Sequence, residues 1–179
     1  MNTKPAAKKG GIFLLLYISY VIIYIARLNL SMASPAMRDS GVLTAVELGF
    51  IGSAFSVVYS CGRLFNGVLG DRLAPKLLIV TGLALAGAAN LLIGLLPPYL
   101  ILLVLWCVNA FGQSMLWSAL LRTMTSLYGK AQADKKVPIL VSSVAVGNII
   151  GILLGSQLVS SFGIRAAFFV PGARRFWPV

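Results

Sequence analysis

The sequence predicts an all-α protein whose helices cross a membrane, and two observations lead to this prediction. Hydrophobic residues make up 59% of the chain and charged residues only 11%, a balance outside the range of soluble domains. Apolar runs longer than about 18 residues recur along the chain, and each can cross a hydrocarbon layer of roughly 30 Å as a helix. Strands are therefore not expected to contribute.

Five complete spans and one partial span are expected in order along the chain. The first apolar run is too long for a signal peptide and has no clear small-residue cleavage site, so we interpret it as a retained helix. The sixth run is interrupted by Arg174 and Arg175, which predicts a truncated sixth helix. The predicted segments are a cytoplasmic N-terminus at 1–10, spans at 11–34, 46–70, 77–96, 99–121 and 137–161, a partial span at 164–173, and an atypical tail at 174–179.

The connections between the spans support this order. Pro97 and Pro98 end the third span, and the short link predicts an antiparallel hairpin with the fourth. Residues 128–138, YGKAQADKKVP, predict a long polar loop on the cytoplasmic surface. Basic residues gather on alternate connections, so the net charge of +11 reflects an N-terminus in the cytoplasm rather than nucleic-acid binding. On that side lie Lys4, Lys8, Lys9, Arg72, Lys76, Lys130, Lys135 and Lys136.

Small residues within the spans indicate packing. Gly147, Gly151 and Gly155 recur at every fourth position and predict a smooth stripe for close helix contact, with a sliding surface as the functional alternative. Cys61 and Cys107 lie inside predicted helices without the spacing of a metal site, so they are expected to be small core residues. The sequence predicts no metal site, cofactor or disulfide.

Two arginines lie within predicted spans, Arg27 in the first and Arg63 in the second. A charged side chain exposed to hydrocarbon costs from roughly 2.5 to more than 10 kcal/mol, and no acidic residue inside a span is available to neutralise either one. We therefore expect both arginines to face a wet cavity and to bind an anionic ligand, for which the planar guanidinium fork is suited. The alternative is that each side chain reaches along its helix to the lipid headgroups.

The stretch GVLGDRLAPK, residues 67–76, resembles the signature between the second and third helices of the major facilitator superfamily. Physically, Gly67 permits a close helix approach, while Asp71 and Arg72 lie at a helix end where they can make charged contacts. The resemblance implies that Asp71 and Arg72, together with Arg122 of the fourth helix, form a cytoplasmic gate cluster that stabilises one of two alternating-access states. The glycine common two positions after the arginine is Ala74 here.

Three further stretches resemble the organophosphate:phosphate antiporters, the glycerol-phosphate and hexose-phosphate transporters. They are YIARLN at 24–29, VYSCGRLFNGVLGDR at 58–72 and GQSMLWSALLRTM at 112–124. The resemblance implies the N-terminal six-helix bundle of such a transporter, with Arg27 as the main anion contact and Arg63 as a supporting charge. The walls of the site would be formed by Tyr24, Asn29, Gln113 and Trp117.

Departures from the family pattern widen the range of substrates. Leu28 stands where members often have a second basic residue, Ser118 and Ala119 replace a proline pair, and the fifth-helix histidine has no counterpart because the chain contains none. The expected function is alternating-access transport of a small organic anion, a sugar phosphate or other organophosphate or a sugar acid, rather than an enzymatic reaction.

The expected location is a bacterial inner membrane, and the expected partner is the missing C-terminal half or a second chain. Two other functions stay open: a transporter-like sugar-phosphate sensor, and a membrane subunit that does not itself transport.

Overall fold

The computed structural model describes residues 6–169, with every side chain except those of residues 6–8 and 71. This part of the chain contains helices and no strand, so the predicted all-α class is confirmed. By length and composition, five of these helices can cross a membrane. The helices are α1 (Ala6–Asp39), α2 (Ala45–Arg72), α3 (Pro75–Ile93), α4 (Tyr99–Tyr128), α5 (Lys130–Phe162) and the short α6 (Ala166–Phe169).

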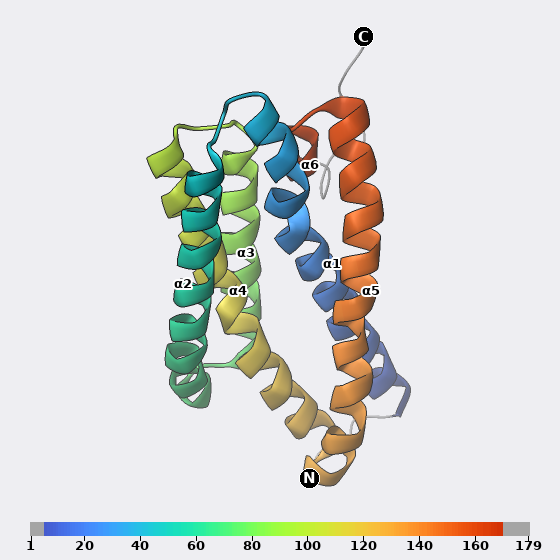
Figure 1. The fold of residues 1–179 in the computed structure, drawn as a ribbon. Helices are drawn as coiled ribbons and strands as arrows, with labels where there is room; N and C mark the ends of the chain where they lie inside the picture. The colour runs from blue at the N-terminus through green and yellow to red at the C-terminus, as the bar shows by residue number, and fades with distance from the viewer. Residues whose placement is uncertain (1–5, 170–179) are drawn as a thin grey trace.

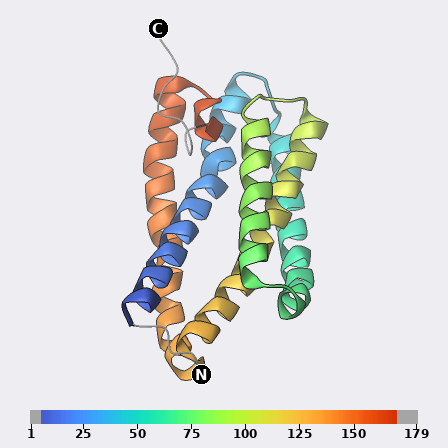
Figure 2. The ribbon, with the colours of Figure 1, turned by 180° about the vertical axis from the view of Figure 1, so that it is seen from behind.

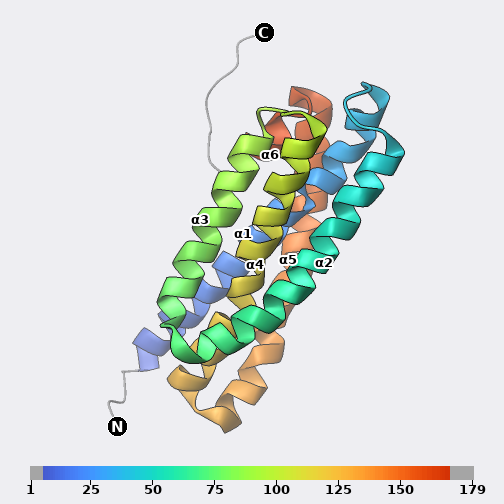
Figure 3. The same cartoon turned by 90° about the vertical axis from the view of Figure 1, so that its left-hand side faces the viewer.

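The helices pack in two groups that α4 connects (Figure 1). Helix α1 packs along α5, while α2 and α3 pack along α4, and the C-terminal end of α4 leans over to reach α5. Seen from behind, α6 lies at one end of the bundle, where it contacts α1, α3 and α5 (Figure 2). The side view shows α3, α4 and α2 next to one another (Figure 3).

Several helix ends are fixed by local chemistry. Thr44 caps α2: its hydroxyl accepts from the Glu47 backbone N–H at 3.2 Å, and the Glu47 carboxylate accepts from the Thr44 backbone N–H at 2.8 Å. Pro75 occupies the first turn of α3, where a missing N–H costs nothing. Gly129 and Gly163 have φ values of 72° and 79°, which glycine adopts without strain, and they separate α4 from α5 and α5 from α6.

The predicted polar loop at 128–138 is wrong, because Gly129 is the whole connection between α4 and α5. Alanine, glutamine and lysine in this stretch are good helix formers, so the helix continues outside the apolar span. Pro138 lies inside α5 and cannot donate to the carbonyl of Asp134, but Asp134 is exposed and water can satisfy that group. Hydrophobicity alone therefore underestimates the length of this helix.

Three other expectations differ from the structure. Helix α3 ends at Ile93 rather than at residue 96, because the chain turns after Gly94 and Leu96 adopts a φ of 55°. Cys61 is exposed and Cys107 is half-buried, so neither is a core residue. Within the partial span at 164–173 only Ala166–Phe169 is helical, and residues 170–173, with the tail at 174–179, lie outside the described residues.

Apolar packing forms two main clusters with a polar level between them. One cluster includes Leu30, Phe55 and Trp106, and the other includes Ile23 and Leu116. Arg27 on α1 and Gln113 on α4 lie along their helices between the two clusters. Large apolar side chains cover the outer surface, as expected for helices in lipid; the most exposed include Leu64 (76%), Phe65 (73%), Val46 (68%) and Leu100 (68%).

Candidate functional site

Arg27 projects from α1 toward aromatic rings of α1 and α2. Its guanidinium carbon lies 4.4 Å from the ring centroid of Tyr59, 4.9 Å from that of Phe55 and 5.6 Å from that of Tyr24. The side chain is half-buried. Aromatic faces attract a cation through their quadrupole, by about 0.5–1 kcal/mol at exposed sites and 2 or more when desolvated. These rings therefore hold the guanidinium in place while leaving its charge uncompensated.

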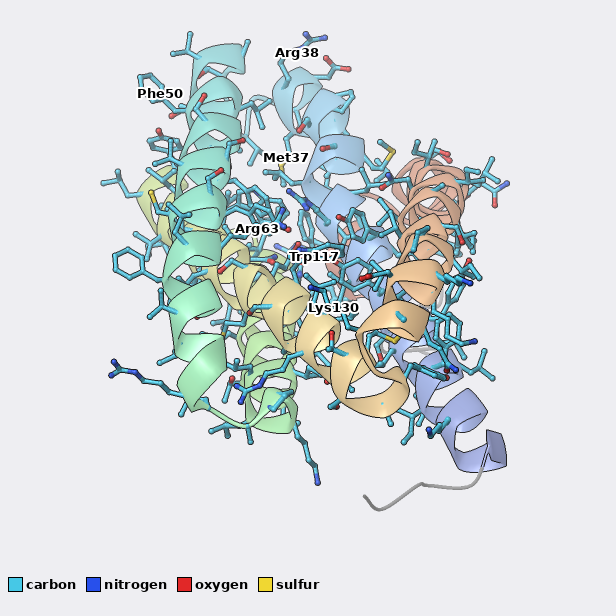
Figure 4. All side chains as sticks on the ribbon, turned by 90° about the horizontal axis from the view of Figure 1, so that it is seen from below. Met37, Arg38, Phe50, Arg63, Trp117 and Lys130 are labelled. Atoms are coloured by element: carbon cyan, nitrogen blue, oxygen red, sulfur yellow. The ribbon has the colours of Figure 1, made fainter. Side chains whose placement is uncertain are left out.

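Arg63 approaches the same aromatic group from α2. Its guanidinium carbon lies 5.9 Å from the ring centroid of Tyr59 and 5.4 Å from that of Trp117 on α4. Figure 4 shows Arg63 beside Trp117 in the centre of the bundle, viewed from the end that carries Lys130. Tyr59 thus borders both arginines. We call Arg27, Arg63 and their four rings, Tyr24, Phe55, Tyr59 and Trp117, the arginine–aromatic cluster.

The charge of this cluster is unbalanced. Among the described side chains, the one salt bridge joins Arg38 and Asp39, 3.6 Å apart at the end of α1. Neither Arg27 nor Arg63 has a carboxylate partner within the part of the chain that the structure describes. Because two positive charges share a ring and no carboxylate among the described side chains balances them, the local field favours an anionic ligand.

A cavity of about 390 Å³ opens in front of Arg27. Its volume is within the range of small-molecule sites, roughly 300–1,000 Å³. Helices α1, α2, α4 and α5 all contribute to its wall, and Arg63 is not among the lining residues. The lining residues are Tyr24, Arg27, Leu28, Leu30, Ser31, Ser34, Leu48, Gly52, Phe55, Trp106 and Asn148.

Two of the predicted site residues lie elsewhere. The Asn29 amide donates to the Asn90 side-chain oxygen at 3.5 Å, and the Gln113 amide donates to the Asn109 side-chain oxygen at 2.6 Å. Gln113 and Asn90 line a second, mostly apolar cavity of about 240 Å³ between α1, α3, α4 and α6. The structure therefore brings Tyr24, Arg27, Arg63 and Trp117 together and leaves Asn29 and Gln113 apart from them.

The predicted gate residues lie around the C-terminal end of α2. The Arg122 guanidinium of α4 donates to the Leu73 carbonyl at 3.2 Å, where a positive charge also complements the helix dipole. Arg72 is exposed at the end of α2. The side chain of Asp71 lies outside the described residues.

The close approach between α2 and α4 is not made by Gly67. A Cβ built at Gly67 meets no described atom within 4 Å, whereas one built at Gly70 lies 3.4 Å from the Ser118 Cβ. The Ser118 hydroxyl also donates to the Asn66 carbonyl at 3.0 Å. The contact at Gly70 is an ordinary one that a larger residue could make, whereas a Cβ built at Gly62 would clash with the Ser114 hydroxyl and lie 3.0 Å from the Ser114 Cβ, so within the described chain Gly62 is the small residue that allows α2 and α4 to meet closely.

The glycine stripe of α5 faces α1. A Cβ at Gly147 would lie 2.7 Å from the Cβ of Tyr24, one at Gly151 would lie 3.3 Å from the Ile25 Cα, and one at Gly155 would lie 2.8 Å from the Met32 Cγ. At Gly147 and Gly151 the backbone of α1 is among the nearest atoms, so no larger residue fits there without moving α1, whereas at Gly155 only the Met32 side chain would have to shift. This contact sets the position of Tyr24 and therefore one wall of the cavity.

The sequence prediction missed Tyr59, Phe55 and Tyr20, whose ring lies 5.4 Å from that of Tyr24 and 6.1 Å from that of Trp117. A signal for them exists in the sequence. Helix α1 places aromatic residues at 20 and 24 before Arg27, and α2 places them at 55 and 59 before Arg63. Residues three or four apart share a helix face, so both arginines are preceded by an aromatic face.

Comparison with known proteins identifies the family of the chain. Residues 16–173 match the sequence model of the Major Facilitator Superfamily. The chain is 26% identical over 161 residues to a probable hexose phosphate transport protein of Chlamydia muridarum, covering 90% of this chain and 35% of the relative.

Two other relatives differ in their described roles. A probable sulfoacetate transporter of Cupriavidus necator is 31% identical over 154 residues, covering 86% of this chain and 36% of the relative. A membrane sensor protein of Salmonella typhimurium is 24% identical over 161 residues, covering 90% of this chain and 36% of the relative. The chain spans about a third of the length of these curated relatives, and the predicted family resemblance is confirmed.

Proposed function

Because this chain belongs to the major facilitator superfamily and is an integral membrane protein, we propose that it forms the anion-binding part of a transporter for small organic anions. The observation that carries this proposal is the pair of arginines around Tyr59, which have no acidic partner among the described side chains. A binding site for a cation or a neutral solute would not need two unpaired positive charges within the membrane span.

Arg27 is the proposed main contact, since it lines the cavity and its planar fork can donate two hydrogen bonds to one oxyanion. Arg63 adds positive potential from the far side of Tyr59, while Tyr24 and Trp117 shape the aromatic wall. Phosphate, sulfonate and carboxylate groups all fit this chemistry. The relatives described as hexose phosphate and sulfoacetate transporters support a strong oxyanion attached to a small organic group.

Transport requires a second bundle, because this chain spans about a third of the length of its relatives. We propose that the remainder of a longer protein, or a second chain, covers the open side of the cavity. The anion then biases the two alternating states through its different contacts in each. The contact between Arg122 and the Leu73 carbonyl supports a gate at the C-terminal end of α2, on the side proposed to be cytoplasmic.

A membrane sensor is the second candidate, and the sensor relative favours it. A sensor and a transporter share the anion-binding step and differ in whether solute crosses the membrane. Uptake of a labelled anion into proteoliposomes distinguishes them, since a sensor binds the anion without accumulating it. A non-transporting subunit would bind the anion only in a complex of fixed stoichiometry.

The proposal is tested by Arg27→Gln in the 179-residue chain, purified in detergent, with glycerol phosphate and sulfoacetate as the probes. Hydrogen bonds to a charged group contribute about 1.5–3 kcal/mol each, so the affinity measured by calorimetry should fall about 10- to 100-fold. Arg38→Gln is the matched control, because Arg38 is exposed and pairs with Asp39. Unchanged affinity in Arg27→Gln, or an equal loss in Arg38→Gln, would contradict the proposal.

A further inference from the structure

We infer that Ser31 and Asn148 bind the uncharged polar groups of the ligand, so that the site selects a hydroxyl-bearing organic anion. This inference rests on the anion site proposed above and adds residues that recognise the other end of the ligand. The arginine–aromatic cluster holds the oxyanion but offers nothing that discriminates among the organic groups attached to it.

Ser31 and Asn148 lie in the same cavity as Arg27. Ser31 is four residues after Arg27 on α1, so the two side chains share a helix face one turn apart. Asn148 reaches the cavity from α5, next to Gly147, which fixes α5 against α1. A ligand held at Arg27 and extending along the cavity would therefore pass between a hydroxyl and an amide.

Ser31 differs from the other described serines of α1 in its hydrogen bonding. A serine hydroxyl within a helix commonly donates to a carbonyl three or four residues earlier. Ser19 donates to Leu15 at 2.7 Å and Ser34 to Leu30 at 2.7 Å. Ser31 makes no such bond within the described chain, although it stands on the same helix and lines the cavity. Its hydroxyl is therefore available to a ligand.

The asparagines give the same contrast. Asn29, Asn66 and Asn90 donate side-chain hydrogen bonds, and Asn109 accepts one from Gln113. Asn148 is half-buried in the fifth helix and has no hydrogen-bond partner among the described residues. Unpaired amides within a membrane span are costly unless a ligand or water satisfies them.

The chemistry of the two groups favours hydroxyls. A serine hydroxyl and an asparagine amide each donate and accept, as does the hydroxyl of a polyol or sugar, so every donor can meet an acceptor. Phe55 and Trp106 contribute apolar wall for the carbon skeleton between those hydroxyls. The ligand class is therefore a small organic anion with hydroxyl groups on its carbon chain.

The test compares two probes that differ in hydroxyl groups and share a phosphate: glycerol phosphate and propyl phosphate. Ser31→Ala and Asn148→Leu are each expected to lower the affinity for glycerol phosphate about three- to tenfold, as the loss of one neutral hydrogen bond predicts. The affinity for propyl phosphate should change less than twofold in both variants. Ser34→Ala is the matched control, because Ser34 lines the same cavity but its hydroxyl is already bonded to the Leu30 carbonyl. Ser34→Ala should change neither affinity.

The outcomes separate this inference from the proposed function. If Ser31→Ala and Asn148→Leu lose affinity for both probes equally, or for neither, the role proposed for Ser31 and Asn148 is overturned. The anion site itself is tested separately by Arg27→Gln. A parent chain that binds propyl phosphate as tightly as glycerol phosphate overturns the inference as well. Ser31 is exposed and alanine favours helix, so Ser31→Ala keeps the test valid even where Asn148→Leu does not fold.

Discussion

Two polar regions lie at the same level of the bundle and differ in how their polar groups are matched. The arginine–aromatic cluster carries two full charges, is partly accessible, and has no counter-charge among the described side chains. The other region, which we call the amide cluster, consists of four neutral side chains on α1, α3 and α4 that are at most 6% exposed. Its members are Asn29, Asn90, Asn109 and Gln113.

The difference shows that polarity inside a membrane bundle does not by itself identify a binding site. The amides bond to one another and to backbone, which joins α1 to α3, while the Asn109 Nδ2 and Gln113 Oε1 atoms are buried without a hydrogen-bond partner among the described residues. The arginines lie on rings that hold them without neutralising them. A full charge without a counter-charge among the described side chains is therefore a better indicator of a ligand than a buried amide.

The largest expected effect comes from filling the cavity of the arginine–aromatic cluster with Gly52→Leu. Gly52 lines the cavity, and a Cβ built there meets no described atom within 4 Å, so the new side chain occupies ligand space without displacing the protein. Leucine also favours helix over glycine by up to about 1 kcal/mol. We expect this variant to fold normally and to lose binding of glycerol phosphate, as measured by calorimetry.

Gly49→Leu is its control. Gly49 lies about one turn away on α2, has equally open space around it and does not line the cavity. The affinity of Gly49→Leu for glycerol phosphate should equal that of the parent chain. If Gly52→Leu binds normally, or if both variants lose binding, the ligand does not occupy this cavity.

The next effect concerns stability, and it is expected from Gln113→Leu in the amide cluster. Removing Gln113 takes away the hydrogen bond to the Asn109 side-chain oxygen, and leaving that buried atom unpaired costs about 1–3 kcal/mol in the free energy of unfolding. Loss of the Gln113 Oε1, which has no partner among the described residues, offsets part of this cost. The thermal unfolding midpoint in detergent should fall, while the affinity for glycerol phosphate should change less than twofold. Replacing both residues with apolar ones, Asn109→Val and Gln113→Leu, should restore much of the midpoint.

A large loss of affinity in Gln113→Leu would return this residue to the binding site that the sequence predicted for it. An unchanged unfolding midpoint would instead show that the amide cluster contributes little to stability.

The sequence predicts the fold class well and singles out two candidate site residues, Arg27 and Arg63, for a physical reason. Composition and run length determine the all-α membrane class, and the cost of a charge in hydrocarbon marks Arg27 and Arg63 without knowledge of the fold. The sequence distinguishes poorly between the surroundings of Gln113 and those of Trp117, because residues four apart on a helix differ by only about 40° around its axis. Helix α4 contacts α2, α3 and α5, so this small angle sends Gln113 toward α3 and Trp117 toward Arg63.

The remaining misses have a similar origin. Helix α5 begins at Lys130 because polar residues with good helix propensity extend it beyond the apolar span, and span prediction from hydrophobicity ignores such residues. Tyr59 was missed because an aromatic residue in a membrane helix is ordinary by itself. Only the arrangement in space shows that one ring borders two guanidinium groups.

The smallest expected effect concerns that ring. Tyr59→Leu removes the aromatic face shared by Arg27 and Arg63, and an attraction of about 0.5–1 kcal/mol at such a partly exposed site corresponds to a two- to fivefold loss of affinity for glycerol phosphate. Tyr59→Phe keeps the ring and should bind like the parent chain, since the attraction belongs to the π face. An equal loss in both variants would mean that the Tyr59 hydroxyl contacts the ligand. No loss in Tyr59→Leu would mean that the other rings, Phe55 and Trp117, suffice to hold the two arginines in place for the anion.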